Sequence, residues 1–130
     1  MIGPGAVFEI PAELADPPQR RHEANPVPRI SRWVLIVSSK TDCRDARHPT
    51  VLVVLLRAQV EWQGRHDVLI KRPDGGIRTD SIAQTDMMFA VDKRDLLDDR
   101  HRGDVMTDTL RQVRAKLGEG LGFGPSIKPE

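Results

Sequence analysis

The sequence contains few of the residues on which several protein classes depend. Its 130 residues include one cysteine, Cys43, so no intramolecular disulfide can form, and no paired Cys/His spacing predicts a structural zinc site. A reducing cytoplasm is the compartment that we expect from this cysteine content. Aromatic residues make up 4% of the chain and tyrosine is absent, so the core must consist of Val, Leu and Ile, and few side chains can stack on bases.

The chain also lacks a long apolar stretch. No run approaches the roughly 20 residues that a membrane span requires, and the N-terminus has neither the basic region nor the apolar core of a signal peptide. We therefore expect a protein without a membrane segment. A chain of this length is expected to form one domain around one core.

Charge is balanced overall and uneven along the chain. The net charge is +1, but residues 20–79 hold 12 Lys/Arg against 6 Asp/Glu, whereas residues 80–130 hold 8 against 10. The basic half could bind a polyanion, or it could be an ordinary solvated surface. The sequence alone leaves both interpretations open.

Runs of β-branched residues and Leu predict a mainly β chain. We expect strands at 4–10, at 32–39, and at 50–62 with a bend near Arg57. A hairpin should follow, with a strand at 67–71, a turn formed by "RPDGG" and a return strand that leads to Asp86. Residues 11–29 contain five prolines and predict a long irregular loop.

The periodicity changes after Asp86. Asp92 is expected to cap a short helix or turn, and apolar residues at 106, 110, 113 and 117 predict an amphipathic helix over Asp104–Leu117, capped at its end by Gly118. Several strands followed by one long helix are typical of a small barrel with a helix packed beside it. Residues 1–118 should form this domain, and residues 119–130 a flexible tail.

Five segments together resemble a known family. They are "PGAVFEI", "RWVLIVS", "TVLVVLLRAQ", "SIAQTDMMFAVDK" and a closing helix followed by "GEGLGF". In order and spacing these segments resemble the PemK/MazF toxins of toxin–antitoxin systems, over nearly the whole chain. The resemblance implies an SH3-like β-barrel of the MazF/PemK/CcdB type with a C-terminal helix. It also implies a homodimer that cleaves single-stranded RNA without metal or cofactor and is neutralised by a cognate antitoxin.

The resemblance also implies catalytic residues. Attack of a ribose 2'-hydroxyl on the adjacent phosphate needs a base, an acid and a cation that offsets the charge on the phosphoryl oxygens. Arg32 matches the arginine that opens the family's second strand. Arg57 stands where the family has Thr or Ser, so it is either a second phosphate ligand or a sign that the reaction is lost. Asp86 matches the acid of an Arg-x-Asp pair in some members, but the arginine is replaced here by Gln84.

Four further residues are candidates for RNA contact: Gln84, Arg78, Trp62 and Ser38. Trp62 could stack an unpaired base or simply pack at the barrel rim, and Ser38 could be a polar strand end or a turn residue. Asp86 could equally satisfy backbone donors where a strand breaks. Because of Arg57 and Gln84, the alternative function is a barrel that binds an antitoxin, a nucleic acid or gyrase without catalysis, as the similar CcdB toxins bind gyrase.

Overall fold

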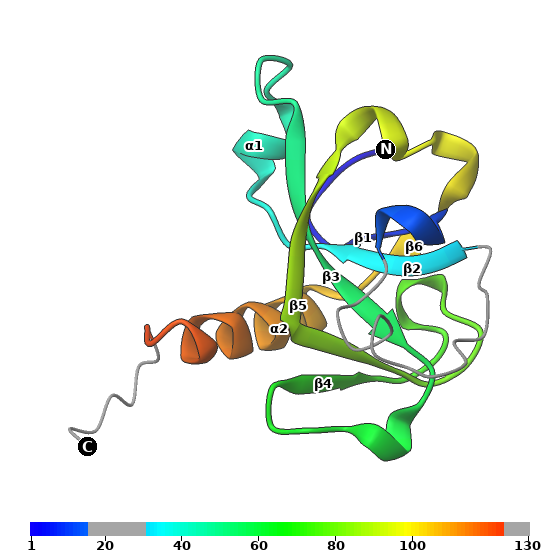
Figure 1. Cartoon of the computed structure of the whole chain (residues 1–130), viewed down its shortest axis with the longest axis vertical. Coiled ribbons are helices and arrows are strands. Elements are labelled where there is room, and N and C mark those ends of the chain that lie inside the picture. Colours follow the sequence, from blue (N-terminus) through cyan, green and yellow to red (C-terminus); the bar gives the residue numbers. More distant parts are fainter. Residues whose placement is uncertain (16–30, 124–130) are drawn as a thin grey trace.

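The computed structural model describes residues 1–15 and 31–123 and confirms a mainly β fold with a C-terminal helix (Figure 1). The strands are β1 Ala6–Pro11, β2 Ser31–Ile36, β3 Thr50–Arg57, β4 Asp67–Ile70, β5 Ser81–Asp92 and β6 His101–Asp104. The helices are α1 Lys40–Arg44 and α2 Thr107–Gly120, and the short 3₁₀ helices η1, η3, η4, η5 and η6 cover Ala12–Leu14, Val60–Trp62, Asp74–Gly76, Lys93–Asp95 and Asp98–Arg100.

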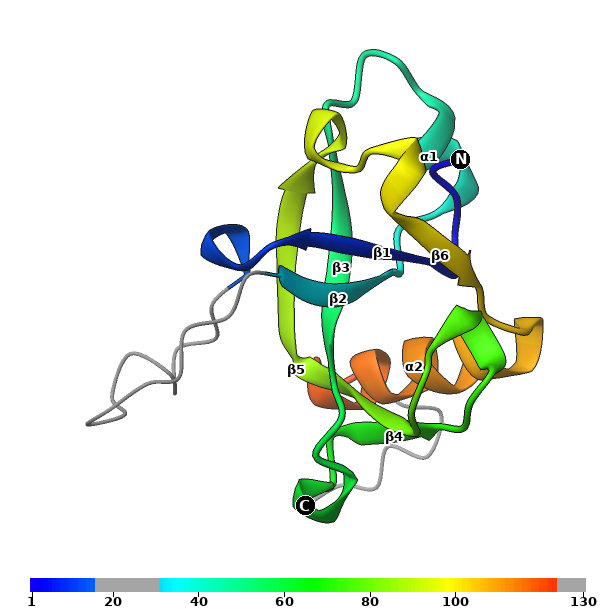
Figure 2. The ribbon, with the colours of Figure 1, turned by 90° about the vertical axis from the view of Figure 1, so that its right-hand side faces the viewer.

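The strands form one antiparallel sheet in the order β4-β5-β3-β2-β1-β6. The sheet is strongly curled, so that β1 and β2 run across the long strands β3 and β5 (Figure 1, Figure 2). Helix α2 lies between the β1–β2 layer and β4, where it fills the open side of the curl (Figure 2). This arrangement confirms the small barrel with a helix that the sequence predicts.

Both faces of the central strands are buried. The curled sheet encloses one hydrophobic cluster on its first face, and helix α2 covers a second cluster on the opposite face. Val53 and Leu55 of β3 pack in a cluster with Phe8, whereas Val54 packs in a second cluster that includes Val113 of α2. The alternation of side chains along a strand places these two sets on opposite faces. This explains why the central strands are continuous apolar runs.

Helix α2 differs from its prediction at both ends. It begins at Thr107 rather than Asp104, and Met106 is exposed, so the buried face is formed by Val113 together with partly buried Leu110 and Leu117. At the C-terminus the helix continues through Gly118. Its end is closed by Gly122, with φ +85°, and by a hydrogen bond from the Phe123 amide to the Gly118 carbonyl.

Several segments depart from, or extend beyond, the sequence prediction. The polar stretch 40–49 contains α1, which is capped by the Ser39 hydroxyl accepting from the Asp42 amide. The short strand β6 has no apolar alternation by which it could be recognised. The expected loop 11–29 and tail 119–130 lie largely outside the described residues, although positions 119 and 120 belong to α2.

Candidate functional site

Two candidate arginines face each other across neighbouring strands. Trp33 of β2 pairs with Leu56 of β3 in antiparallel register, so Arg32, one residue before, and Arg57, one residue after, lie opposite one another on the other face. Arg32 is 3% exposed. An arginine keeps its charge when it is buried, because its guanidinium group does not lose its proton in proteins. The strand register therefore concentrates two permanent positive charges at the N-terminal end of β2.

The loop between β4 and β5 brings a third arginine to this place. Its two glycines, Gly75 and Gly76, have φ of +70° and +74°, a region that favours glycine. A Cβ on Gly76 would collide with the carbonyl of Arg102 in β6. The loop therefore packs directly on the backbone of β6, and the chain leaving it carries Arg78 to the end of β2.

Arg32, Arg57 and Arg78 line one pocket, with a volume of about 240 Å³. We call it the arginine pocket. Its lining residues are Ser31, Arg32, Trp33, Leu56, Arg57, Ala58, Ile77, Arg78, Thr79 and Ser81. Three arginines and three residues that carry hydroxyl groups thus line one small cavity. Guanidinium forks bind phosphate oxygens in proteins, so the arginines give the pocket the chemistry of a phosphate site. The hydroxyls of Ser31 and Ser81 already donate to Glu9 and to the Thr79 carbonyl.

Trp62 stands beside this pocket. Strand β3 ends at Arg57, where the sequence predicts a bend, and the chain continues into η3, whose last residue is Trp62. The Cζ atom of Arg57 lies 4.7 Å from the centroid of the indole, which is a cation–π contact. Trp62 is 60% exposed, so much of its surface remains accessible to a base next to the arginine pocket.

Trp33 forms the other aromatic wall. Arg78 and Arg102 both lie over its ring, with Cζ atoms 6.0 and 5.9 Å from the centroid. Arg102 donates hydrogen bonds of 2.6 and 3.1 Å from Nη2 and Nε to Glu9 Oε1. The Ser31 hydroxyl donates to the other carboxylate oxygen at 2.5 Å, and this bond, followed by that of Arg102, lowers the pKa of Glu9.

Asp86 occupies a different place. Strand β5 does not break at this residue: it runs through a bulge, in which Gln84 pairs with Leu55 and Met88 pairs with the adjacent Val54. The three intervening residues have no partner on β3, and the bulge turns the Asp86 side chain outward, where it is exposed. This explains a charged residue within an apolar strand. Thr85 is fixed by hydrogen bonds from its amide and hydroxyl to the His66 carbonyl.

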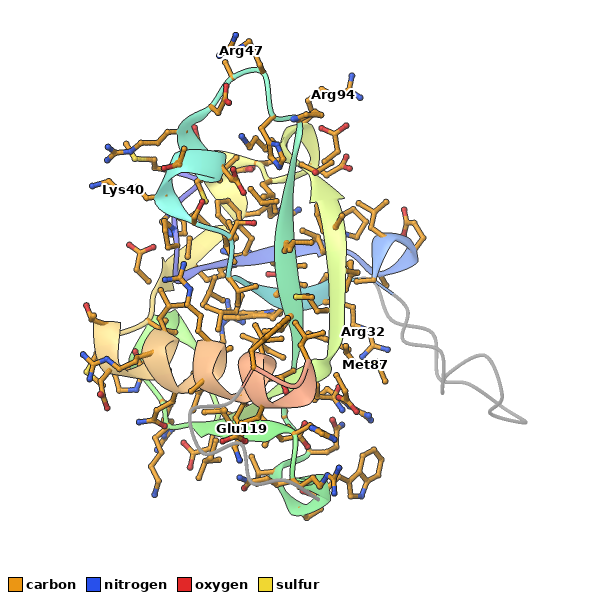
Figure 3. All side chains as sticks on the ribbon, turned by 90° about the vertical axis from the view of Figure 1, so that its left-hand side faces the viewer. Arg32, Lys40, Arg47, Met87, Arg94 and Glu119 are labelled. Carbon is orange, nitrogen blue, oxygen red and sulfur yellow. The ribbon has the colours of Figure 1, made fainter. Side chains whose placement is uncertain are left out.

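Asp86 lines a second pocket of about 300 Å³, between the bulge and the end of α2. We call it the Asp86 pocket. Its lining residues are His66, Thr85, Asp86, Met88, Lys116, Leu117, Gly120 and Leu121. The structure thus brings Arg32, Arg57 and Arg78 together and places Asp86 in another pocket. Figure 3 shows Arg32 near Met87 of the bulge at the right-hand side of the molecule, with Arg47 and Arg94 at the top.

The remaining two candidates lie outside both pockets. Ser38 follows β2 at the end opposite Arg32, roughly 20 Å away by the rise of an extended chain. It is buried, and its hydroxyl accepts the Leu52 amide at 2.7 Å, so it joins two strand ends. Gln84 is 8% exposed, and its Oε1 has no hydrogen-bond partner within the described residues. It shares a sheet face with Arg57 through the β3–β5 register.

Sequence reasoning missed the residues behind the arginine pocket. Glu9 and Arg102 lie 93 positions apart, in strands whose pairing brings them together. The one sequence feature that could have pointed to this pair is Glu9, an acid within the apolar run "AVFEI".

Within positions 1–15 and 31–123, no group of three or more His, Cys, Asp or Glu side chains is placed to hold a metal ion. No helix in the same part of the chain is long and apolar enough to cross a membrane.

The sequence matches the family of PemK-like, MazF-like toxins of type II toxin–antitoxin systems over residues 7–121. The chain therefore belongs to this family, as its motifs predict. No curated protein sequence matches it.

Solved structures show the same fold. An endoribonuclease from a Mycobacterial species is 19% identical, with a TM-score of 0.67 over 96% of this chain and 94% of the other. A Mycobacterial endoribonuclease in complex with its cognate antitoxin is also 19% identical, with a TM-score of 0.63 over 98% and 96%. A MazE–MazF structure from Deinococcus radiodurans is 14% identical, with a TM-score of 0.68 over 95% and 99%.

Proposed function

We propose that this protein is a toxin that cleaves single-stranded RNA, with the scissile phosphate bound in the arginine pocket. The observation that carries the proposal is the convergence of Arg32, Arg57 and Arg78, from three separate segments, on one cavity of about 240 Å³. Membership of the toxin family and the fold shared with Mycobacterial endoribonucleases support it. The substrate that we propose is mRNA, and the compartment is the cytoplasm.

The reaction follows from the chemistry of RNA. The 2'-oxygen attacks the adjacent phosphorus, its proton passes to a base, and the bond to the 5'-oxygen breaks as that oxygen takes up a proton. The products are a 2',3'-cyclic phosphate and a 5'-hydroxyl. The nucleophile belongs to the substrate, so the proposed reaction needs no metal or cofactor. Arg32 and Arg57 stabilise the charge that grows on the non-bridging oxygens, because their positions are fixed before the reaction begins.

The two pockets divide the remaining roles. Trp62, beside Arg57, stacks an unpaired base, and Arg78 holds a phosphate oxygen at the pocket rim. Asp86 contacts or exchanges protons with RNA that extends into the Asp86 pocket. Gln84 and Ser38 have the least support, because neither lines the arginine pocket or the Asp86 pocket.

The proposal includes protein partners. One structure with this fold contains an endoribonuclease bound to its cognate antitoxin, and another contains MazE with MazF. We propose that this chain likewise binds an antitoxin and acts as a homodimer. Exposed apolar side chains at Leu52 and Met88 of the sheet offer surface for such contacts.

The decisive experiment is cleavage of a long single-stranded RNA by the purified protein in EDTA. Arg32→Ala should lower the cleavage rate by about 10²- to 10³-fold, the range for loss of one charge-stabilising group. Arg47→Ala is the matched control, because its side chain is 95% exposed and lies at the top of the molecule in Figure 3, well above Arg32. Equal cleavage by Arg32→Ala and Arg47→Ala would overturn the proposed site. RNA binding without any cleavage by the wild type would establish the non-catalytic alternative.

A further inference from the structure

Trp33 joins two arginines that come from different parts of the chain. Arg102 belongs to β6, and Arg78 follows the loop that packs on β6 through Gly76. Both guanidinium groups lie about 6 Å from the indole centroid, at 5.9 and 6.0 Å. This is within the distance at which a cation is attracted to an aromatic face. The indole is therefore a common support for two cations at the wall of the arginine pocket.

The two arginines differ in their charge partners. Arg102 is ion-paired with Glu9 at 2.6 Å, and both side chains are largely buried. Within the described residues, Arg78 has no carboxylate at ion-pair distance. Arg102 is thus anchored and neutralised, whereas Arg78 lines the pocket with its charge available to a ligand. Glu9 also accepts from the hydroxyl of Ser31, which is itself a lining residue.

We propose that Glu9, Arg102 and Trp33 are positioning residues that fix Arg78 for an RNA phosphate. Glu9 holds Arg102, Arg102 holds the indole, and the indole holds the guanidinium of Arg78 at the pocket wall. This inference rests on the proposed function, because it assigns an RNA phosphate to the arginine pocket. It adds three residues that do not touch the substrate and gives Trp33 a role that depends on its aromatic ring.

Positioning by Glu9 and simple charge attraction predict opposite changes in RNA affinity when Glu9 is replaced. Replacing Glu9 by Gln removes a negative charge near a phosphate site, which by Coulomb attraction alone should strengthen RNA binding. If Glu9 acts through Arg102 and Trp33, the same substitution should weaken binding, because Arg78 is no longer held in place. The sign of the change therefore separates positioning from a general charge effect.

The test measures binding of a single-stranded oligonucleotide that carries 2'-O-methyl groups and so cannot be cleaved. We expect Glu9→Gln and Arg102→Met each to weaken binding about threefold to tenfold, the size of one partly exposed cation–π contact. Arg100→Met is the matched control, because Arg100 is an exposed arginine that also acts electrostatically on Glu9 but lies outside the arginine pocket. It should weaken binding less than Arg102→Met. Tighter binding by Glu9→Gln would overturn the inference.

A double-mutant cycle covers the case in which Glu9→Gln does not fold. If Arg102 acts through Arg78, the variant carrying Arg78→Met and Arg102→Met should bind as weakly as Arg78→Met alone. Additive losses would overturn the inference, and so would the absence of binding by the wild type at low salt. Coupled losses in a protein that does not cleave unmodified RNA would support positioning while rejecting the proposed activity, so the two failures are distinguishable.

Discussion

The arginine pocket and the Asp86 pocket are built by different structural means. Strand register forms the first: Arg32 and Arg57 are opposite one another because β2 and β3 pair in antiparallel alignment, and Arg32 is almost completely buried. A departure from register forms the second, since the β5 bulge turns Asp86 outward beside the end of α2. One site is fixed by the sheet, and the other lies where the sheet is interrupted.

This difference separates the arginines of the proposed phosphate site from Asp86, the acid that the family resemblance assigns to the same reaction. Binding a ligand costs little conformational entropy when the binding groups are fixed in a buried sheet, because their positions are already set. An exposed carboxylate in a bulge must be ordered by the ligand itself. The arginine pocket should therefore dominate the rate of the proposed reaction, and the Asp86 pocket should affect mainly how RNA binds.

The largest effect beyond Arg32 should come from Arg57, which replaces the Thr or Ser that the family has here. If Arg57 is a phosphate ligand, Arg57→Met should lower the cleavage rate by about 10- to 100-fold. Arg57→Lys should keep part of the activity, because lysine supplies a positive charge but lacks the two-pronged guanidinium group. The rates are measured with saturating RNA, so that weaker binding is excluded. Equal or faster cleavage by Arg57→Thr would show that the arginine is not needed at this position.

Trp62 should have the next largest effect, and on binding rather than on rate. Trp62→Ala removes the exposed indole that lies on Arg57, and a stacked base is worth about 1 to 3 kcal/mol. We expect weaker binding of single-stranded RNA and little change for double-stranded RNA, whose bases are not available for stacking. Trp62→Phe should restore most of the affinity. A uniform loss with both kinds of RNA would indicate that Trp62 supports the fold of η3 instead.

Sequence patterns predicted the strands of the sheet more successfully than the surroundings of the candidate site. The apolar runs at β2 and β3 are continuous, so their burial followed from composition, whereas Arg32 and Arg57 were predicted from the resemblance to the toxin family. The bulge was not predictable, because no proline or glycine marks it between Gln84 and Met88. The Glu9–Arg102 pair depends on contacts between distant strands, and one of these, β6, has no apolar pattern.

Asp86 should have a smaller effect than either arginine. Because it lies in another pocket, Asp86→Asn should lower kcat/KM by less than about tenfold, mostly through KM. Lys116→Gln is a suitable comparison, since Lys116 lines the same pocket with the opposite charge and should also act on KM. A loss in kcat as large as that of Arg32→Ala would show that bound RNA brings Asp86 to the reacting phosphate.

The last effect is on stability rather than on activity: Glu9 should make the free energy of unfolding depend on pH. Its pKa is lowered in the folded protein by the hydrogen bonds of Ser31 and Arg102, with Arg100 also acting on it. Below the ordinary carboxyl pKa of 4.5 the unfolded chain binds the proton more readily than the folded protein does. The stabilisation is therefore complete above that value and is lost as pH falls through the folded pKa.

Chemical denaturation of wild type and Glu9→Gln at several pH values checks this sign. At neutral pH the substitution should cost about 1 to 3 kcal/mol, as expected when a buried, charge-assisted hydrogen-bond partner is removed, and the difference should shrink on acidification below 4.5. Glu13 and Asp95, which line the cavity beside Glu9, remain in both proteins and cancel in the comparison. Asp92 is a surface carboxylate that can be compared with Glu9, because its pKa is also lowered, in this case by the hydrogen bond from the exposed Arg94. A difference for Glu9→Gln that stays constant down to strongly acidic pH would show that its carboxylate is not held by Arg102 in solution, and the positioning of Arg78 would then lack its anchor.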